Sequence, residues 1–232
     1  MSIDMTYFEI NQIKSDIEIF INELDNRSLL LRSNNLNQEE KEFFVFISKH
    51  IVFFKYLYNG MGKMYFFKVI ISDLYYYILS ILKNETRYIY LNERSIIENY
   101  TRAVVKKTVE EDHVTNNLFL IMKKMNFAFD FKNEDYSLIK DEYVTSCGYI
   151  HGGNILDDNL AFVFNECMSN TKFIKDTSKY YKRITKIFRI YDKMLISEYG
   201  EDISGCFHRR KTLLKYLLGN DCYNLIFEVI KQ

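Results

Sequence analysis

Proline and tryptophan are absent from this 232-residue sequence, and only eight glycines occur. Proline and glycine are the residues that most often end helices and form tight turns, so their scarcity leaves few breaks in regular structure. A fold built from many short strands needs far more turn residues than this chain has. These absences therefore predict an all-α protein.

An excess of charge is also absent, because 31 basic residues balance 31 acidic ones. No overall field draws the chain to nucleic acid or to a membrane, and either partner would need a local patch. The four cysteines show no CxxC spacing and no signal peptide precedes them, which predicts reduced thiols and a cytoplasmic protein. Apolar runs such as residues 69–82 are interrupted by Asp73 and are too short to span a bilayer, so we expect no membrane partner.

The sequence does contain many apolar residues, and they recur with the period of an α-helix. Hydrophobic residues make up 48% of the chain, which suits a single all-α domain over residues 1–232. We expect a bundle of roughly eight or nine helices, with residues 65–82 as its buried centre. The expected helices lie near residues 8–21, 43–57, 65–82, 93–102, 115–129, 134–151, 161–170, 176–199 and 204–232.

Two segments carry the most specific polar pattern. In ERSIIENYTR, Arg94, Glu98 and Arg102 recur every fourth residue and share one helix face. In DEYVTSCGYIHGG, a helical pattern runs into His151, which two glycines follow. The two segments together predict a site in which a cation, a carboxylate and an imidazole converge.

This RxxxE helix, followed about fifty residues later by a helix ending in YxxSxxxxHG, resembles the HEPN superfamily, specifically its divergent branches in bacterial abortive-infection proteins. The resemblance covers residues 88–232 and leaves residues 1–87 as additional N-terminal helices. It implies a helical bundle, a homodimer and a metal-independent ribonuclease of a toxin or phage-defence system, with an antitoxin or defence partner. The chain departs from the HEPN arginine–histidine motif, since no arginine lies within six residues before any histidine.

Cleavage of RNA needs a general acid or base and a cation that faces the phosphate. His151 is the predicted acid or base, and Arg94 is predicted to hold the phosphate while Glu98 orients it. Tyr143 is expected to line the same face, and Ser146 to donate a hydrogen bond. No cofactor is implied, and the HExxH or paired Cys/His spacings of a zinc site are missing.

A structural interpretation stands beside each role. Arg94 and Glu98 can form an ordinary intrahelical ion pair, and His151 can satisfy carbonyls at the end of its helix. The protein is then a noncatalytic helical module that binds a protein partner. Exposure of Arg94 and His151 in one open cleft favours the enzyme, whereas burial favours the module.

A basic stripe follows on the segment after residue 172. Its members are spaced by three or four residues and so line one face of a helix, opposite an apolar stripe that begins at Tyr180. Such a stripe can lie along an RNA backbone, or it can be an ordinary solvated face. The predicted RNA-binding residues are Lys175, Lys179, Lys182, Lys186, Arg189 and Lys193.

Overall fold

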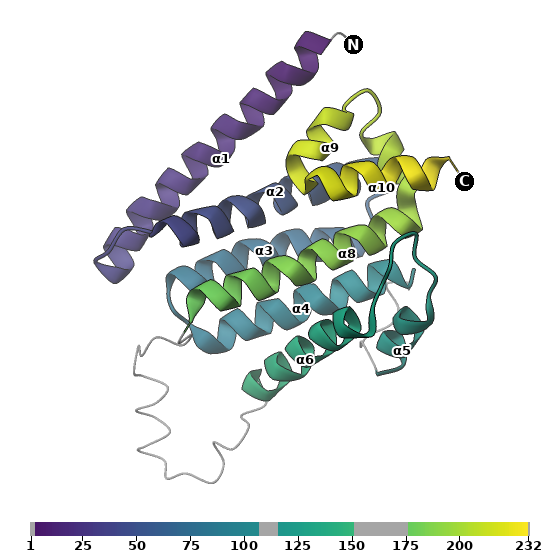
Figure 1. The fold of residues 1–232 in the computed structure, drawn as a ribbon. Coiled ribbons are helices and arrows are strands. Elements are labelled where there is room, and N and C mark those ends of the chain that lie inside the picture. The colour runs from purple at the N-terminus through teal and green to yellow at the C-terminus, as the bar shows by residue number, and fades with distance from the viewer. Residues whose placement is uncertain (1–2, 107–115, 151–175, 232) are drawn as a thin grey trace.

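The computed structural model describes residues 3–106, 116–150 and 176–231, and within these ranges it contains nine helices and no strand (Figure 1). This confirms the all-α bundle of eight or nine helices. The helices are α1 (Ile3–Arg32), α2 (Gln38–Gly60), α3 (Tyr65–Leu82), α4 (Thr86–Val104), α5 (Asn116–Lys124), α6 (Asn133–Ile150), α8 (Thr177–Cys206), α9 (Lys211–Leu218) and α10 (Asn220–Ile230).

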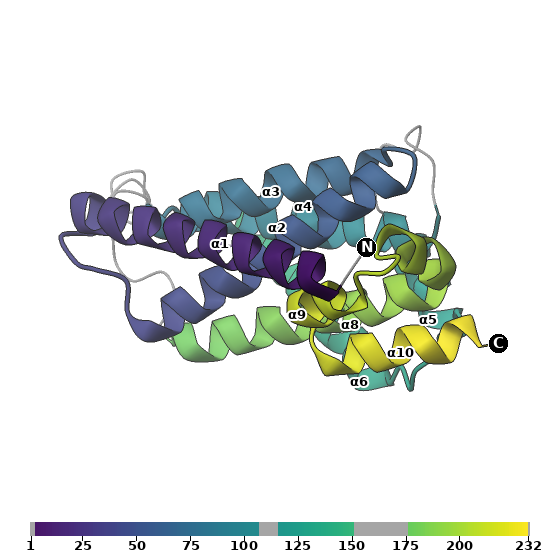
Figure 2. The ribbon, with the colours of Figure 1, turned by 90° about the horizontal axis from the view of Figure 1, so that it is seen from above.

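Helix α8 lies at the centre of the arrangement. It packs against α2, α4, α6, α9 and α10, while α3 packs along α4 and α2. Helices α2 and α8 start at the same end of the molecule and run side by side in the same direction (Figures 1 and 2). One hydrophobic core runs through the described helices, from Ile10 in α1 to Ile226 in α10.

Helix α3 was predicted as the buried centre, and this is wrong for one of its faces. Phe67, Ile70 and Leu74 are fully buried, but Tyr65 and Tyr76 are 48% and 59% exposed. The helix covers the outside of α2 and α4, so only the side that meets them is buried. Of the described helices, α3 is the one long and apolar enough to cross a membrane by length and composition, a test that core helices also pass.

Two predicted helices are shorter than expected. The helix predicted for residues 115–129 ends at Lys124, and beyond it the Ala128 N–H donates to Ser197 Oγ of α8 at 3.0 Å. The helix predicted for residues 204–232 is divided, since α8 continues to Cys206 and Gly219 separates α9 from α10. The helix predicted for residues 161–170 lies outside the described residues.

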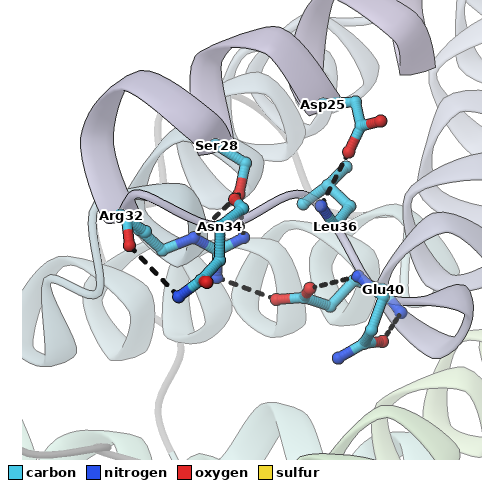
Figure 3. Close-up of polar contacts among 7 residues, drawn as sticks. Asp25, Ser28, Arg32, Asn34, Leu36 and Glu40 are labelled. Atoms are coloured by element: carbon cyan, nitrogen blue, oxygen red, sulfur yellow. Dashed lines mark hydrogen bonds and ion pairs between the residues drawn. The ribbon is translucent and has the colours of Figure 1, made fainter.

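The corner between α1 and α2 fixes where α2 begins (Figure 3). Asn37 caps α2, with its side chain accepting from the Glu40 N–H at 2.9 Å while Glu40 Oε2 accepts from the Asn37 N–H at 2.9 Å. Arg32 of α1 holds the other Glu40 oxygen at 2.8 Å, and Asp25 accepts from the Leu36 N–H at 2.7 Å. This network orients the first turns of α2, which line the groove described below.

Candidate functional site

The structure brings Arg94, Glu98 and Tyr143 together. Arg94 Nε donates to Glu98 Oε1 at 2.9 Å, one turn along α4, and the Tyr143 hydroxyl of α6 donates to the same oxygen at 3.1 Å. The Arg94 guanidinium lies 5.8 Å from the centre of the Tyr143 ring. The side chain of Arg94 is 25% exposed, so this cluster reaches the surface only at its edge.

The protonation states in this cluster suit binding better than base catalysis. Burial, followed by the negative charge of Glu98, raises the pKa of Tyr143, so its hydroxyl stays a donor. Nearby on α3, Asp73 accepts a hydrogen bond from Ser95 Oγ at 2.7 Å. Burial raises the pKa of Asp73 to about 6, with Ser95 opposing the shift and Glu98 adding to it. Asp73 therefore changes charge near pH 6.

Ser146 lies apart from Arg94, in the interior of the bundle. Its hydroxyl is fully buried and donates to Glu93 Oε1 at 2.6 Å, while the Tyr180 hydroxyl donates to Glu93 Oε2 at 2.6 Å. Tyr77 forms a further hydrogen bond with Tyr180. Ser146 is thus part of a buried network around Glu93.

A second carboxylate, Glu142, completes this buried network. It is held by Arg183, whose Nη2 donates to Glu142 Oε1 at 2.9 Å and whose Nε donates to the other oxygen. Burial, followed by the charge of Glu142, raises the pKa of Glu93 well above its ordinary value. Burial and the nearby Glu142 therefore favour the neutral form of Glu93.

Sequence reasoning missed Glu93 and Glu142, although a signal was present. Glu93 stands at helical spacing from Ile89, Ile96 and Ile97, which are all buried. Such spacing places its side chain on the inner face of α4. A carboxylate on an inner face needs partners, and the network supplies them.

His151 lies outside the described residues, directly after the end of α6. At that end, Arg87 Nη2 of α4 donates to the Ile150 carbonyl at 3.4 Å. Arg87 and Arg94 are seven residues apart, so two arginines of α4 lie near one helix face. Arg87 is a second candidate cation that sequence reasoning missed.

The histidines in the described part of the chain do not belong to a cluster of metal ligands. His50 is buried, with Nε2 2.9 Å from Asp192 Oδ2 and Nδ1 2.8 Å from the Phe46 carbonyl oxygen. The Tyr100 hydroxyl donates to the other Asp192 oxygen at 3.3 Å. Within the described part of the chain, no three His, Cys, Asp or Glu side chains are placed to hold a metal ion.

The basic stripe forms one face of α8, except for Lys175, which lies outside the described residues. Three of its lysines are in ion pairs: Lys179 with Asp176 at 2.9 Å, Lys186 with Asp135 at 3.6 Å and Lys193 with Asp221 at 3.5 Å. The other two members are exposed, and the structure shows no ion pair for them among the described residues. These two are Lys182 and Arg189.

A groove of about 610 Å³ runs between this face of α8 and the first turns of α2. Its floor contains the buried side chains of Phe43 and Tyr181, which are 3% and 7% exposed and stack on each other with ring centres 4.3 Å apart. Half-buried Phe46 lies beside them. The full lining is Glu39, Glu42, Phe43, Phe46, Ser178, Tyr181, Lys182, Thr185, Lys186 and Arg189.

A second groove, of about 410 Å³, is almost wholly apolar and lies between α1 and α3. Leu30, on its rim, is 76% exposed, and Leu31 and Leu79 are 51% and 39% exposed. Arg27 and Lys83 flank it. Such an apolar surface is typical of a protein-protein contact.

Comparison of the chain with protein-family models, with curated proteins and with solved structures found no match.

Proposed function

We propose that this protein binds single-stranded RNA in the groove between α2 and α8, as a cytoplasmic, HEPN-like protein of a bacterial defence or toxin system. The observation that supports the proposal most strongly is the lining of the groove. Lys182, Lys186 and Arg189 lie along one wall of the groove, and the half-buried ring of Phe46 also lines it. Cations that follow a phosphate backbone, next to rings on which bases stack, are the features of a single-strand binding surface.

The geometry supports binding more directly than cleavage. Glu98 already holds Arg94, and Ser146 faces the interior. Cleavage needs the acid or base predicted at His151, with either Arg94 or Arg87 facing the phosphate. We propose cleavage as the second step of the same function.

A binding assay tests the groove. We expect Lys182→Ala, Lys186→Ala and Arg189→Ala combined to weaken the binding of a fluorescent single-stranded RNA by at least about tenfold, because three phosphate contacts are lost. The matched control removes the same charge elsewhere, with alanine at the exposed lysines 68, 124 and 231. Equal losses in the two variants would show that net charge, and not the groove, carries the binding.

Induced expression tests cleavage. We expect wild type to arrest growth and degrade cellular RNA, and His151→Ala to abolish both while the protein stays folded. Arg94→Ala and Arg87→Ala, made side by side, identify which arginine acts on the phosphate. Growth arrest with RNA cleavage in all three variants would contradict the predicted catalytic site.

A noncatalytic interaction module is the second candidate function, and the apolar groove between α1 and α3 favours it. Leu30 and Leu79 expose apolar surface there without a polar role. An interaction module would bind its protein partner normally when Lys182, Lys186 and Arg189 are replaced by alanine. It would no longer bind that partner with Leu30→Glu. That pattern, without RNA binding, would replace the RNA proposal.

A further inference from the structure

The groove between α2 and α8 carries carboxylates as well as cations. Glu39 and Glu42 stand on the α2 wall, and both are exposed. Carboxylates repel phosphate, so their presence weakens a surface that only follows an RNA backbone. They are useful in such a groove when they contact a part of RNA other than phosphate.

The two signs of charge are kept on separate walls. Glu39, Glu42 and Phe46 follow one face of α2, because they are three and four residues apart. Lys182, Lys186 and Arg189 follow one face of α8 in the same way. Helices α2 and α8 run side by side in the same direction (Figure 1). Because Glu39 and Glu42 line the groove from α2 and the three cations line it from α8, one wall is acidic and the other is basic.

The aromatic floor lies between these walls. Phe43 comes from the acidic helix and Tyr181 from the basic helix, and their rings stack at the bottom of the groove. The acidic wall is fixed in place by the Asn37 cap at the start of α2 and by Gln38, whose Nε2 donates to Glu42 Oε1 at 2.8 Å. Each Glu42 oxygen can still accept from a ligand, because a carboxylate offers about four lone-pair positions.

We propose that Glu39 and Glu42 select bases that carry an exocyclic amino group. This inference rests on the proposed RNA binding and concerns the same groove. The phosphates lie on Lys182, Lys186 and Arg189, and the base edges face the α2 wall. A carboxylate accepts a hydrogen bond from the amino group of cytosine, adenine or guanine, whereas uracil presents a carbonyl oxygen at the position where cytosine has its amino group.

The most direct probe is a pair of eight-nucleotide RNAs, one all cytidine and one all uridine. The two RNAs have the same backbone charge, and cytosine and uracil are both single-ring bases. The RNAs therefore differ mainly in the amino group of cytosine, which uracil replaces with a carbonyl oxygen. We expect wild type to bind the cytidine octamer about tenfold more tightly than the uridine octamer at neutral pH, the size of one good base-edge contact.

The variant Glu39→Gln with Glu42→Gln tests whether the preference comes from the α2 wall. Glutamine keeps the size of the side chain and can donate as well as accept, so we expect both octamers to bind and the preference to disappear. Removing two negative charges also strengthens RNA binding generally. The control for this loss of charge is the variant Glu18→Gln with Glu23→Gln, which removes two exposed glutamates of α1. It should keep the preference for the cytidine octamer.

The outcomes separate the inference from the proposed function. Equal binding of the two octamers by wild type, or a preference that survives in the Glu39→Gln, Glu42→Gln variant, overturns base selection and leaves RNA binding in place. Binding of neither octamer overturns both. Because Glu39 also lies in the first turn of α2, where acids stabilise a helix, the melting temperature of each variant is measured alongside.

Discussion

The protonation of Glu93 is linked to folding. Buried beside Glu142, it has a pKa well above the ordinary value of 4.5, mainly because burial disfavours the charged form. The unfolded chain releases this proton once the pH rises above about 4.5, while the folded chain keeps it. Its contribution to stability is therefore greatest at low pH and is lost as the pH rises from that point toward the folded pKa.

Glu93→Gln should remove this pH dependence. Glutamine has the same shape and can donate toward Glu142 without carrying a proton that titrates. We expect the stability of the variant relative to wild type to increase as the pH rises from 5 to 8, measured by chemical denaturation across that range. Glu18→Gln on the surface of α1 is the control, expected to follow the wild-type profile. A constant difference between Glu93→Gln and wild type at every pH would contradict this account of the buried pair.

Helical spacing in the sequence predicted which residues are neighbours on one helix better than it predicted contacts between helices. Arg94 and Glu98 share a face of α4 and do pair. Spacing alone did not show that Ser146 faces Glu93, because that contact depends on how α4 packs against α6. The inner position of Glu93 was readable from its isoleucine neighbours, but hydropathy patterns give weight to apolar residues and pass over a single carboxylate among them.

At the scale of the helices, the break between α9 and α10 depends on one residue. Gly219 has φ +92° and ψ −179°, a backbone conformation that residues with a side chain rarely adopt. The sequence predicts one helix across this point, because a single glycine inside an apolar periodic segment is a weak stop signal. The periodicity of α9 and α10 is helical on both sides of the break.

Gly219→Ala should therefore destabilise the protein by about 1–3 kcal/mol. No atom lies within 4 Å of the added Cβ, so the cost comes from backbone conformation and not from a clash. Gly205→Ala is the matched control: it also meets no atom within 4 Å, but it lies in α8, where alanine stabilises a helix by up to about 1 kcal/mol. Thermal unfolding of both variants measures the contrast, and an equal effect would contradict it.

The groove itself shows why part of the site escaped sequence reasoning. The stripe on α8 was predicted correctly as one helix face, since its three- and four-residue spacing is local. The opposite wall comes from α2, more than a hundred residues earlier, and no local pattern links Glu42 to Lys186. The pairing of Lys186 with Asp135 and of Lys193 with Asp221 likewise depends on tertiary packing.

At the scale of the whole molecule, the apolar groove between α1 and α3 is the surface best suited to the predicted homodimer. We expect the wild-type protein to sediment at twice the 27.9 kDa mass of one chain. Leu30→Glu, at a position 76% exposed, should return it to one chain that stays folded, because the Leu30 side chain lies outside the core. Its melting temperature should no longer depend on protein concentration, because a monomer gains no stability from association. A dimer that survives Leu30→Glu would place the interface elsewhere, and a monomeric wild type would contradict the predicted homodimer.

The dependence of RNA affinity on salt concentration measures how many phosphates the groove between α2 and α8 contacts. Each phosphate contact of a single strand contributes about −0.7 to the slope of log affinity against log salt concentration, so contacts to Lys182, Lys186 and Arg189 predict a slope of about −2. We expect this slope for wild type and a slope near zero when the three residues are alanine. A slope that is the same in both proteins would contradict RNA binding in the groove between α2 and α8.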